Sequence, residues 1–296
     1  MTAKTRAEGI LLGMTLIWGS TFAIGKIVLD EISPLGMIAV RFLLATLILL
    51  AVAYRSIFPL KANQVLKGVI LGLFLFGGFV VQTIGLTITT ASKSAFITGM
   101  MVVFVPLLQI VVERRAPKLG NLFGVIIVSV GLWFLTSPSG SSFNIGDALT
   151  LACALLFGVY IVYLDVVSHD MNAAQLTFLQ VTTNALLAGA GMVAFEGVPH
   201  GLSLGAAGGL LYLTVCATLL TTFLQSRYQK DTTPTRAAII FTIEPVFAAI
   251  LAAMILDERL GWAGMGGGAL IVLGVLVSEL SDNIPILNRS FEFTES

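Results

Sequence analysis

Short polar connections divide the chain into ten apolar stretches, each long enough to cross a lipid bilayer. The stretches cover residues 8–28, 34–54, 65–87, 92–112, 118–136, 146–165, 175–196, 204–227, 235–256 and 260–280. A transmembrane helix needs about 20 consecutive apolar residues. The sequence therefore predicts an all-α polytopic membrane protein with ten transmembrane helices.

The composition supports this interpretation and excludes a soluble protein. Charged residues make up only 11% of the chain and hydrophobic residues 57%, whereas soluble domains carry about 25% charged residues. The formal net charge is zero, so nothing in the charge balance favours nucleic acid as a partner. The first apolar run is long, contains Trp18 and lacks a small-residue cleavage site. We therefore interpret it as a membrane span and not as a signal peptide.

The positions of the basic residues predict the orientation in the membrane. If the N-terminus is cytoplasmic, the cytoplasmic ends and loops hold Lys4, Arg6, Arg55, Lys61, Lys67, Arg114, Arg115, Lys118, Arg227 and Lys230. The opposite side holds Lys26, Lys93 and Arg259, and also the loop with Ser141. Lys and Arg favour cytoplasmic loops. We therefore expect both termini, including the tail 281–296, on the cytoplasmic side of the inner (plasma) membrane, although the predicted cytoplasmic loop 165–175 has no Lys or Arg.

An internal repeat links the two halves of the chain. A shift of about 139 residues aligns several features: Trp18-Gly19 with Phe157-Gly158, Arg41 with Gln180, Val105-Pro106 with Glu244-Pro245 and, after a gap, Gly124 and Gly131 with Gly267 and Gly274. Each half holds an odd number of spans, so the halves insert with opposite topology. The pattern predicts two inverted five-helix repeats, residues 8–136 and 146–280, with a substrate site between them near the membrane midplane.

Polar residues follow one face of several predicted spans. Spacings of three and four place residues on one side of a helix; such sets are Thr15, Gly19, Phe22 and Lys26, then Thr177, Gln180 and Asn184, and then Thr214, Thr218, Thr221 and Gln225. A single Thr or Tyr in a membrane helix often bonds only the backbone or a neighbouring helix. Stripes on several helices together predict a central cavity. Its expected lining is Trp18, Thr21, Phe22, Arg41, Tyr160, Tyr163, Thr177, Gln180, Asn184, Thr218, Gln225 and Glu244.

Two charges and two prolines lie deep in the predicted spans. Arg41 and Glu244 either make structural bonds, to the backbone or to each other, or recognise a charged substrate or a proton. They can pair only if the second and ninth spans are neighbours. Pro245 removes a backbone N–H beside Glu244, and Pro106 gives the fourth span a matching interruption, so we predict hinges at both prolines. Lys26 and Lys93 lie nearer the outer edge and are expected to extend towards it.

Four stretches of the sequence resemble the EamA family of the drug/metabolite transporter superfamily. They are "LIWGSTFAIGK" (16–26), "RFLLATLIL" (41–49), "ASKSAFITGMMVVFVPLL" (91–108) and "QKDTTPTRAAIIFTIEPVFAAILAAMILDERL" (229–260). The resemblance covers about residues 8–280. It implies ten helices in two inverted halves, in a prokaryotic inner membrane, and export of amino acids or other small metabolites. The first span lacks the mid-membrane carboxylate of the related small multidrug pumps.

We therefore expect a secondary transporter that exports small metabolites, with amino acids or related solutes first, by alternating access. We expect no cofactor: Cys153 and Cys216 lie within apolar stretches without metal-ligand spacing, and His169 and His200 lie in predicted loops. Three alternatives remain: a lipid or lipid-linked-sugar flippase, a channel, and an intramembrane enzyme, which would need a nucleophile with a base, paired acids or a metal site within the spans. Expected partners are a small-molecule substrate and membrane lipids, with monomer and homodimer both open.

Overall fold

The computed structural model describes residues 2–114, 116–136, 143–199, 201–257 and 261–281, together with Ile284 and Leu287. It describes the backbone alone for Glu113, Leu135, Thr136 and Glu279. Several predictions concern residues outside this description: Arg115, Ser141, His200, Arg259 and most of the tail 281–296.

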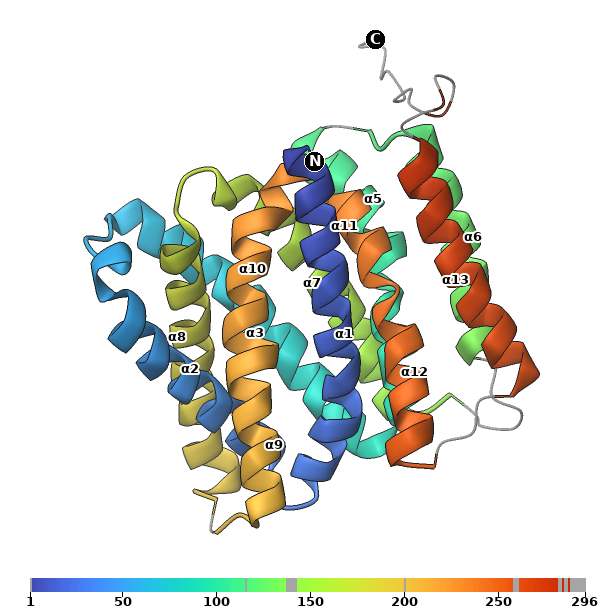
Figure 1. Cartoon of the computed structure of the whole chain (residues 1–296). Coiled ribbons are helices and arrows are strands. Elements are labelled where there is room, and N and C mark those ends of the chain that lie inside the picture. Colours follow the sequence, from blue (N-terminus) through green and yellow to red (C-terminus); the bar gives the residue numbers. More distant parts are fainter. Residues whose placement is uncertain are drawn as a thin grey trace.

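The described chain is entirely helical in its regular structure (Figure 1). The first half contains α1 (Ala3–Leu29), α2 (Pro34–Ile57), α3 (Ala62–Ile88), α4 (Ala91–Gly99), α5 (Met101–Glu113) and α6 (Leu119–Thr136). The second contains α7 (Ile145–Ser168), α8 (Ala173–Gly191), η1 (Met192–Glu196), α9 (Leu204–Thr214), η2 (Val215–Leu220), α10 (Thr221–Tyr228), η3 (Gln229–Asp231), α11 (Pro234–Phe241), α12 (Glu244–Ile255) and α13 (Trp262–Leu280).

These segments combine into ten apolar helices in the described residues. Eight are long and apolar enough to cross a membrane, and the helices at 119–134 and 262–278 are shorter. The expected fold class is confirmed. In Figure 1 the start of α1 and the end of α13 lie at the same end of the molecule.

Two spans, one in each half, consist of two helices separated by a break. The fourth span breaks at Met100, between α4 and α5, and the ninth breaks at Thr242 and Ile243, between α11 and α12. Pro245 is the second residue of the helix that follows its break, as expected. Pro106, however, lies inside α5, so the expectation that it marks the interruption is wrong. A proline crowds the carbonyl four residues before it, and for Pro106 this carbonyl lies inside α5, after the break. The break lies at Met100, directly after Gly99. A Cβ added at Gly99 would lie 3.1 Å from Pro245 Cγ, so the glycine leaves room for this proline.

The N-terminal caps of α4 and α11 show how the two repeats align. Thr90 caps α4 by accepting from the backbone N–H of Lys93, and Thr233 caps α11 by accepting from that of Arg236. Lys93 and Arg236 are thus the third residues of equivalent helices, and Met101 is the equivalent of Glu244. Our pairing of Pro106 with Pro245 is therefore wrong by about one helical turn.

The second half has more residues than the first before its broken span. The gap in the alignment of the repeats therefore lies earlier in the chain than we expected. The connection before α9 is longer than the one before α3, and the span 204–231 has 28 residues where its equivalent 62–88 has 27. The additional residue is accommodated by η2, a π-helical segment with a wider turn than the α-helix. Sequence periodicity assumes a regular α-helix, so it places the gap incorrectly.

Helices α6 and α13 pack against each other through glycines, side by side at one edge of the bundle (Figure 1). A Cβ added at Gly124 would lie 3.0 Å from the carbonyl oxygen of Gly274, and one at Gly131 would lie 2.8 Å from that of Gly267. The repeat equates Gly124 with Gly267 and Gly131 with Gly274. The contact of Gly124 with Gly274 is therefore repeated by their equivalents, Gly267 and Gly131. Two elements related by a two-fold axis make contacts in this pattern.

The same two-fold relation holds at the centre of the bundle. A Cβ added at Gly19 would lie 2.7 Å from Phe247 Cβ, on α12, and one at Gly158 would lie 3.3 Å from Phe104 Cβ, on α5. The missing side chains let α1 approach α12 and α7 approach α5 closely, as small residues do in membrane helices. The two halves therefore interlock around their broken spans.

Candidate substrate-binding cavity

A cavity of about 620 Å³, including the space at its opening, lies between the two halves. Most of its lining consists of pairs of residues that occupy equivalent positions in the repeats: Trp18 and Phe157, Thr21 and Tyr160, Phe79 and Thr222, Gln82 and Gln225, Thr98 and Phe241, and Met101 and Glu244. The pseudo-two-fold axis therefore passes through the cavity.

Two charged residues break this symmetry. Arg41 and Glu244 are the only charged side chains in the described lining. Their equivalents, Gln180 and Met101, are uncharged. A feature that one half has and the other lacks is not required by the architecture of the repeat. These two charges therefore indicate which chemical groups the cavity can bind.

Arg41 is held by the π-helical segment of the eighth span. Its Nε donates to Thr218 Oγ1 and its Nη2 donates to the carbonyl oxygen of Ala217 at 3.2 Å. The guanidinium also lies 4.9 Å from the ring centroid of Phe79, within the range of a cation–π contact. Since a guanidinium has five N–H donors, these bonds leave donors for the cavity.

Glu244 begins α12 directly after the break in the ninth span. It is 8% exposed and lines the cavity, and in the described part of the chain its carboxylate makes no hydrogen bond or ion pair. The N-terminus of a helix favours a negative charge, and Trp18 and Phe241 meet edge to face beside it, with centroids 5.1 Å apart. The ion pair with Arg41 that we considered is not formed between these described residues, because Arg41 bonds the eighth span.

The other expected cavity residues divide into three groups. Tyr160 and Gln225 line the cavity, and Gln180 lies behind them, where its Oε1 accepts from the Tyr160 hydroxyl at 2.7 Å. Thr218 supports Arg41. Phe22 lines a smaller adjoining cavity, described below.

Three expected residues lie away from the described cavity lining. Asn184 donates to the carbonyl oxygen of Gly72 at 3.1 Å, so it joins α8 to α3. Tyr163 packs against Phe74, with centroids 6.1 Å apart. Thr177 is fully buried on α8, and its hydroxyl has no hydrogen-bond partner among the described residues.

Sequence reasoning missed several lining residues. They are Leu75, Phe79, Gln82, Thr98, Met101, Phe157, Ile161, Ala217, Thr222 and Phe241. Gln82 Nε2 donates to Thr98 Oγ1 at 3.1 Å. The signal that could have found Gln82 is its equivalence to Gln225, which requires the correct repeat register. Thr222 lines the cavity in place of the expected Thr218, because η2 rotates the residues that follow it.

A second cavity of about 340 Å³ adjoins the first and shares Thr21, Arg41, Phe79 and Gln82 with it. Its remaining lining includes Gly25 and Leu86, near the C-terminal ends of α1 and α3. The cavity system therefore extends from Arg41 towards that end of the bundle.

The two lysines expected to extend towards the membrane surface each bond another group of the protein, and Lys93 is buried. Lys93 is 9% exposed and its Nζ lies 2.5 Å from Asp147 Oδ2. Lys26 Nζ donates to the carbonyl oxygen of Thr89 at 2.7 Å. The expectation for Lys93 is wrong because a buried carboxylate such as Asp147 needs a charged partner.

Comparisons with known proteins agree with this architecture. Residues 6–137 and 144–280 each match the EamA-like transporter family. An uncharacterized transporter of Archaeoglobus fulgidus is 34% identical over 90% of this chain and 83% of its own length. A second uncharacterized transporter of the same organism is 26% identical over 94% of this chain and 98% of its own length.

A protein of known crystal structure shares the fold, with a TM-score of 0.77 and 16% identity over 93% of this chain and 97% of its own. The family match to both halves agrees with the internal repeat and places the chain among transporters, not enzymes. The chain is a multi-pass membrane protein that belongs to the EamA-like transporter family.

Proposed function

We propose that the protein exports small zwitterionic metabolites, amino acids first, across the inner membrane by alternating access. The observation that carries this proposal is the charge of the cavity lining: one guanidinium and one carboxylate, on different spans and both departures from the repeat symmetry. An amino acid presents the complementary pair of charges within one small molecule.

Each charged group is suited to one end of such a substrate. The remaining N–H donors of Arg41 would bind the α-carboxylate, since a guanidinium matches a carboxylate in geometry and charge. Glu244, which has no partner among the described residues, would bind the α-ammonium. The aromatic walls formed by Trp18, Phe79 and Phe157 would contact an apolar or aromatic side chain.

The same lining argues against multiply charged anions. Recognition of a phosphorylated solute usually involves several Arg or Lys side chains, and Arg41 is the only basic residue in the described lining. The proposal therefore concerns amino acids and related solutes of no net charge.

The proposed mechanism follows from the inverted repeats. Two halves related by a two-fold axis can exchange conformations, which moves the opening of a cavity on that axis from one side of the membrane to the other. The broken spans, α4 with α5 and α11 with α12, would allow this change. The bias of basic residues towards the end that holds the N-terminus supports a cytoplasmic location for both termini.

Thermal stabilisation of the purified protein in detergent tests the substrate class, because a ligand that binds the folded state raises the melting temperature. The panel comprises amino acids, nucleosides, sugars, aromatic cations and phospholipid headgroups. We expect a shift with an amino acid. The amine that lacks its carboxylate and the acid that lacks its ammonium serve as matched controls and should give little shift. A response to lipid headgroups alone would contradict the proposal and favour a flippase.

A further inference from the structure

Two buried ion pairs connect the two halves of the protein. Arg236 Nε, on α11, lies 2.6 Å from Glu8 Oε1, on α1, and the side chains are 4% and 10% exposed. Lys93 Nζ, on α4, lies 2.5 Å from Asp147 Oδ2, on α7, with side chains 11% and 0% exposed. In each pair one charge comes from the first half and the other from the second.

The two ion pairs occupy equivalent positions of the repeat. Glu8 and Asp147 precede Trp18 and Phe157 by the same number of residues, and Arg236 and Lys93 are the third residues of equivalent helices.

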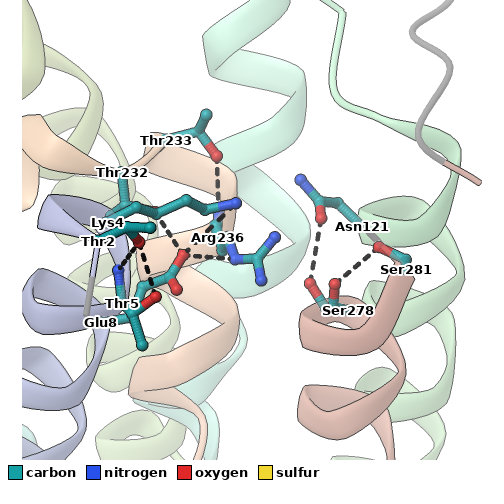
Figure 2. Close-up of polar contacts among 10 residues, drawn as sticks. All are labelled: Thr2, Lys4, Thr5, Glu8, Asn121, Thr232, Thr233, Arg236, Ser278 and Ser281. Atoms are coloured by element: carbon teal, nitrogen blue, oxygen red, sulfur yellow. Dashed lines mark hydrogen bonds and ion pairs between the residues drawn. The ribbon is translucent and has the colours of Figure 1, made fainter. Parts of the chain in front are cut away.

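The threonine neighbours of the two pairs match as well. Thr232 Oγ1 donates to Glu8 Oε1 at 3.1 Å, and Thr89 Oγ1 donates to Asp147 Oδ1 at 2.7 Å. Figure 2 shows the first of these clusters, with Arg236 and Thr232 directed towards Glu8.

The pairs lie at opposite ends of the bundle with the cavity between them. Glu8 is in the first turns of α1, whereas Lys26, near the end of α1, donates to the carbonyl oxygen of Thr89, beside Asp147. At about 1.5 Å per residue, Glu8 and Lys26 are roughly 27 Å apart along the helix. The cavity residues Trp18 and Thr21 lie between them.

Each pair also includes a residue of one of the broken spans. Arg236 lies on α11, and the helix after the break begins with Glu244 in the cavity. Lys93 lies on α4, and the helix after that break begins with Met101 in the same cavity. Each pair is therefore joined to the cavity lining through one broken span.

We propose that these two ion pairs are the two gates of the transporter: Glu8–Arg236 closes the cytoplasmic end, and Lys93–Asp147 closes the outer end. The proposal rests on the alternating-access function above. Opening one end hydrates the two charges there, while the equivalent pair keeps the other end closed. Because an unpaired charge is costly when buried and much less so when hydrated, removing one partner favours the state that is open at that end.

The experiment measures access to the cavity from each side of the membrane and needs no substrate. Thr222→Cys supplies a reporter in the cavity lining, in a background with Cys153→Ala and Cys216→Ala. A membrane-impermeant maleimide is applied to intact cells and to inside-out vesicles. We expect Glu8→Gln to raise the vesicle-to-cell ratio of labelling rates about fivefold or more, the lower end of typical coupling between sites. Asp147→Asn should lower it by a similar factor.

Three controls separate gating from loss of folding. Lys67→Gln breaks an exposed ion pair with Asp170 that also joins the halves, and should leave the ratio unchanged. Glu8→Gln with Arg236→Gln removes both charges of the pair and should raise the ratio less than Glu8→Gln alone. The reversed pair, Glu8→Arg with Arg236→Glu, should return the ratio to that of the parent.

Each outcome decides the proposal. Shifts of the labelling ratio in opposite directions for Glu8→Gln and Asp147→Asn support the gates. If Glu8→Gln lowers the ratio and Asp147→Asn raises it, the gates are supported and the protein has the reverse orientation in the membrane. Shifts in the same direction, or none larger than that of Lys67→Gln, overturn the gates. Because no substrate is added, a wrong substrate class leaves the result unaffected.

Discussion

Glu244 is the residue on which the substrate proposal depends most. Its carboxylate lies in the cavity lining and bonds no other described group, so its position is not explained by a structural bond within the described chain. Arg41, the other charged residue of the lining, differs, because Thr218 and the carbonyl oxygen of Ala217 hold it in place. The two charges should therefore respond differently to neutralisation.

For Glu244→Gln we expect substrate affinity and export to fall about tenfold or more, since a bond between charged groups contributes about 1.5–3 kcal/mol. The melting temperature should stay close to that of the wild type, because no described partner loses a bond. Arg41→Gln, which installs the residue found at the equivalent Gln180, should lower both export and melting temperature. Export from proteoliposomes and melting in detergent are the measurements. A Glu244→Gln protein that folds poorly would contradict this account.

At the residue scale, the sequence identifies polar groups that stand out in apolar surroundings. Arg41 and Glu244 are predicted for this reason, and the structure places both in the cavity lining. Met101 carried no such signal, because it is an apolar residue in an apolar span. It becomes visible only as the equivalent of Glu244, which requires the three-dimensional match of the two halves.

At the scale of helices, the contact of α6 with α13 depends on glycine. Gly131→Ala should destabilise the protein by about 1–3 kcal/mol, because its Cβ would lie 2.8 Å from the carbonyl oxygen of Gly267 and 2.9 Å from the backbone N of Ile271. Gly266→Ala on the partner helix is the matched control, since its Cβ would meet nothing within 4 Å. Melting temperatures compare the two, and equal values would refute this packing.

The start of α9 carries a pH-dependent contact outside the spans. Glu31 accepts from the Ser203 hydroxyl at 2.6 Å and from its backbone N–H at 2.8 Å. These hydrogen bonds, the hydroxyl's first, hold the pKa of Glu31 below its usual 4.5.

A lowered pKa means that this stabilisation is present above about pH 4.5 and is lost as the pH falls through the lower, folded-state value. Glu31→Gln should therefore lower the melting temperature slightly at pH 7 and make little difference in stronger acid. Melting curves of both proteins across this pH range are the measurement. A difference that persists or grows below the folded-state pKa would contradict the assignment.

The eighth span shows why a helical face is only partly predictable from sequence. Spacings of three and four predicted that Thr214, Thr218, Thr221 and Gln225 share one face. The π-helical segment η2 has a wider turn, so Thr222 and Gln225 line the cavity while Thr218 bonds Arg41. The extra residue that makes this turn is visible only when the two halves are compared in three dimensions.

At the scale of the whole molecule, the ten spans could be predicted because their lengths and apolarity depend on the bilayer alone. The relation of the halves was harder. The sequence alignment of the repeats is correct for the glycines of α6 and α13. For the ninth span it is one turn out of register, because it makes two prolines equivalent. The structure shows that Pro106 and Pro245 hold different positions relative to the breaks.

The orientation of the whole molecule can be tested in the described loops. Val198 is 61% exposed in the connection between η1 and α9, which lies outside the cell if both termini are cytoplasmic. Val198→Cys, in a protein without other cysteines, should react with an impermeant maleimide in intact cells. Ala62→Cys, at the start of α3, should react only after permeabilisation. The reverse pattern would show that the termini face outwards.

The most direct test of the central claim is efflux from proteoliposomes that contain the purified protein. The liposomes are loaded with an equimolar mixture of amino acids, nucleosides and sugars, and the contents are followed by mass spectrometry. We predict that one or more amino acids leave faster than from protein-free liposomes, and that Glu244→Gln reduces this loss about tenfold, as the contribution of a charged bond implies. Retention of every amino acid, or equal efflux by the wild type and the variant, would contradict the assignment of the cavity as the transport site.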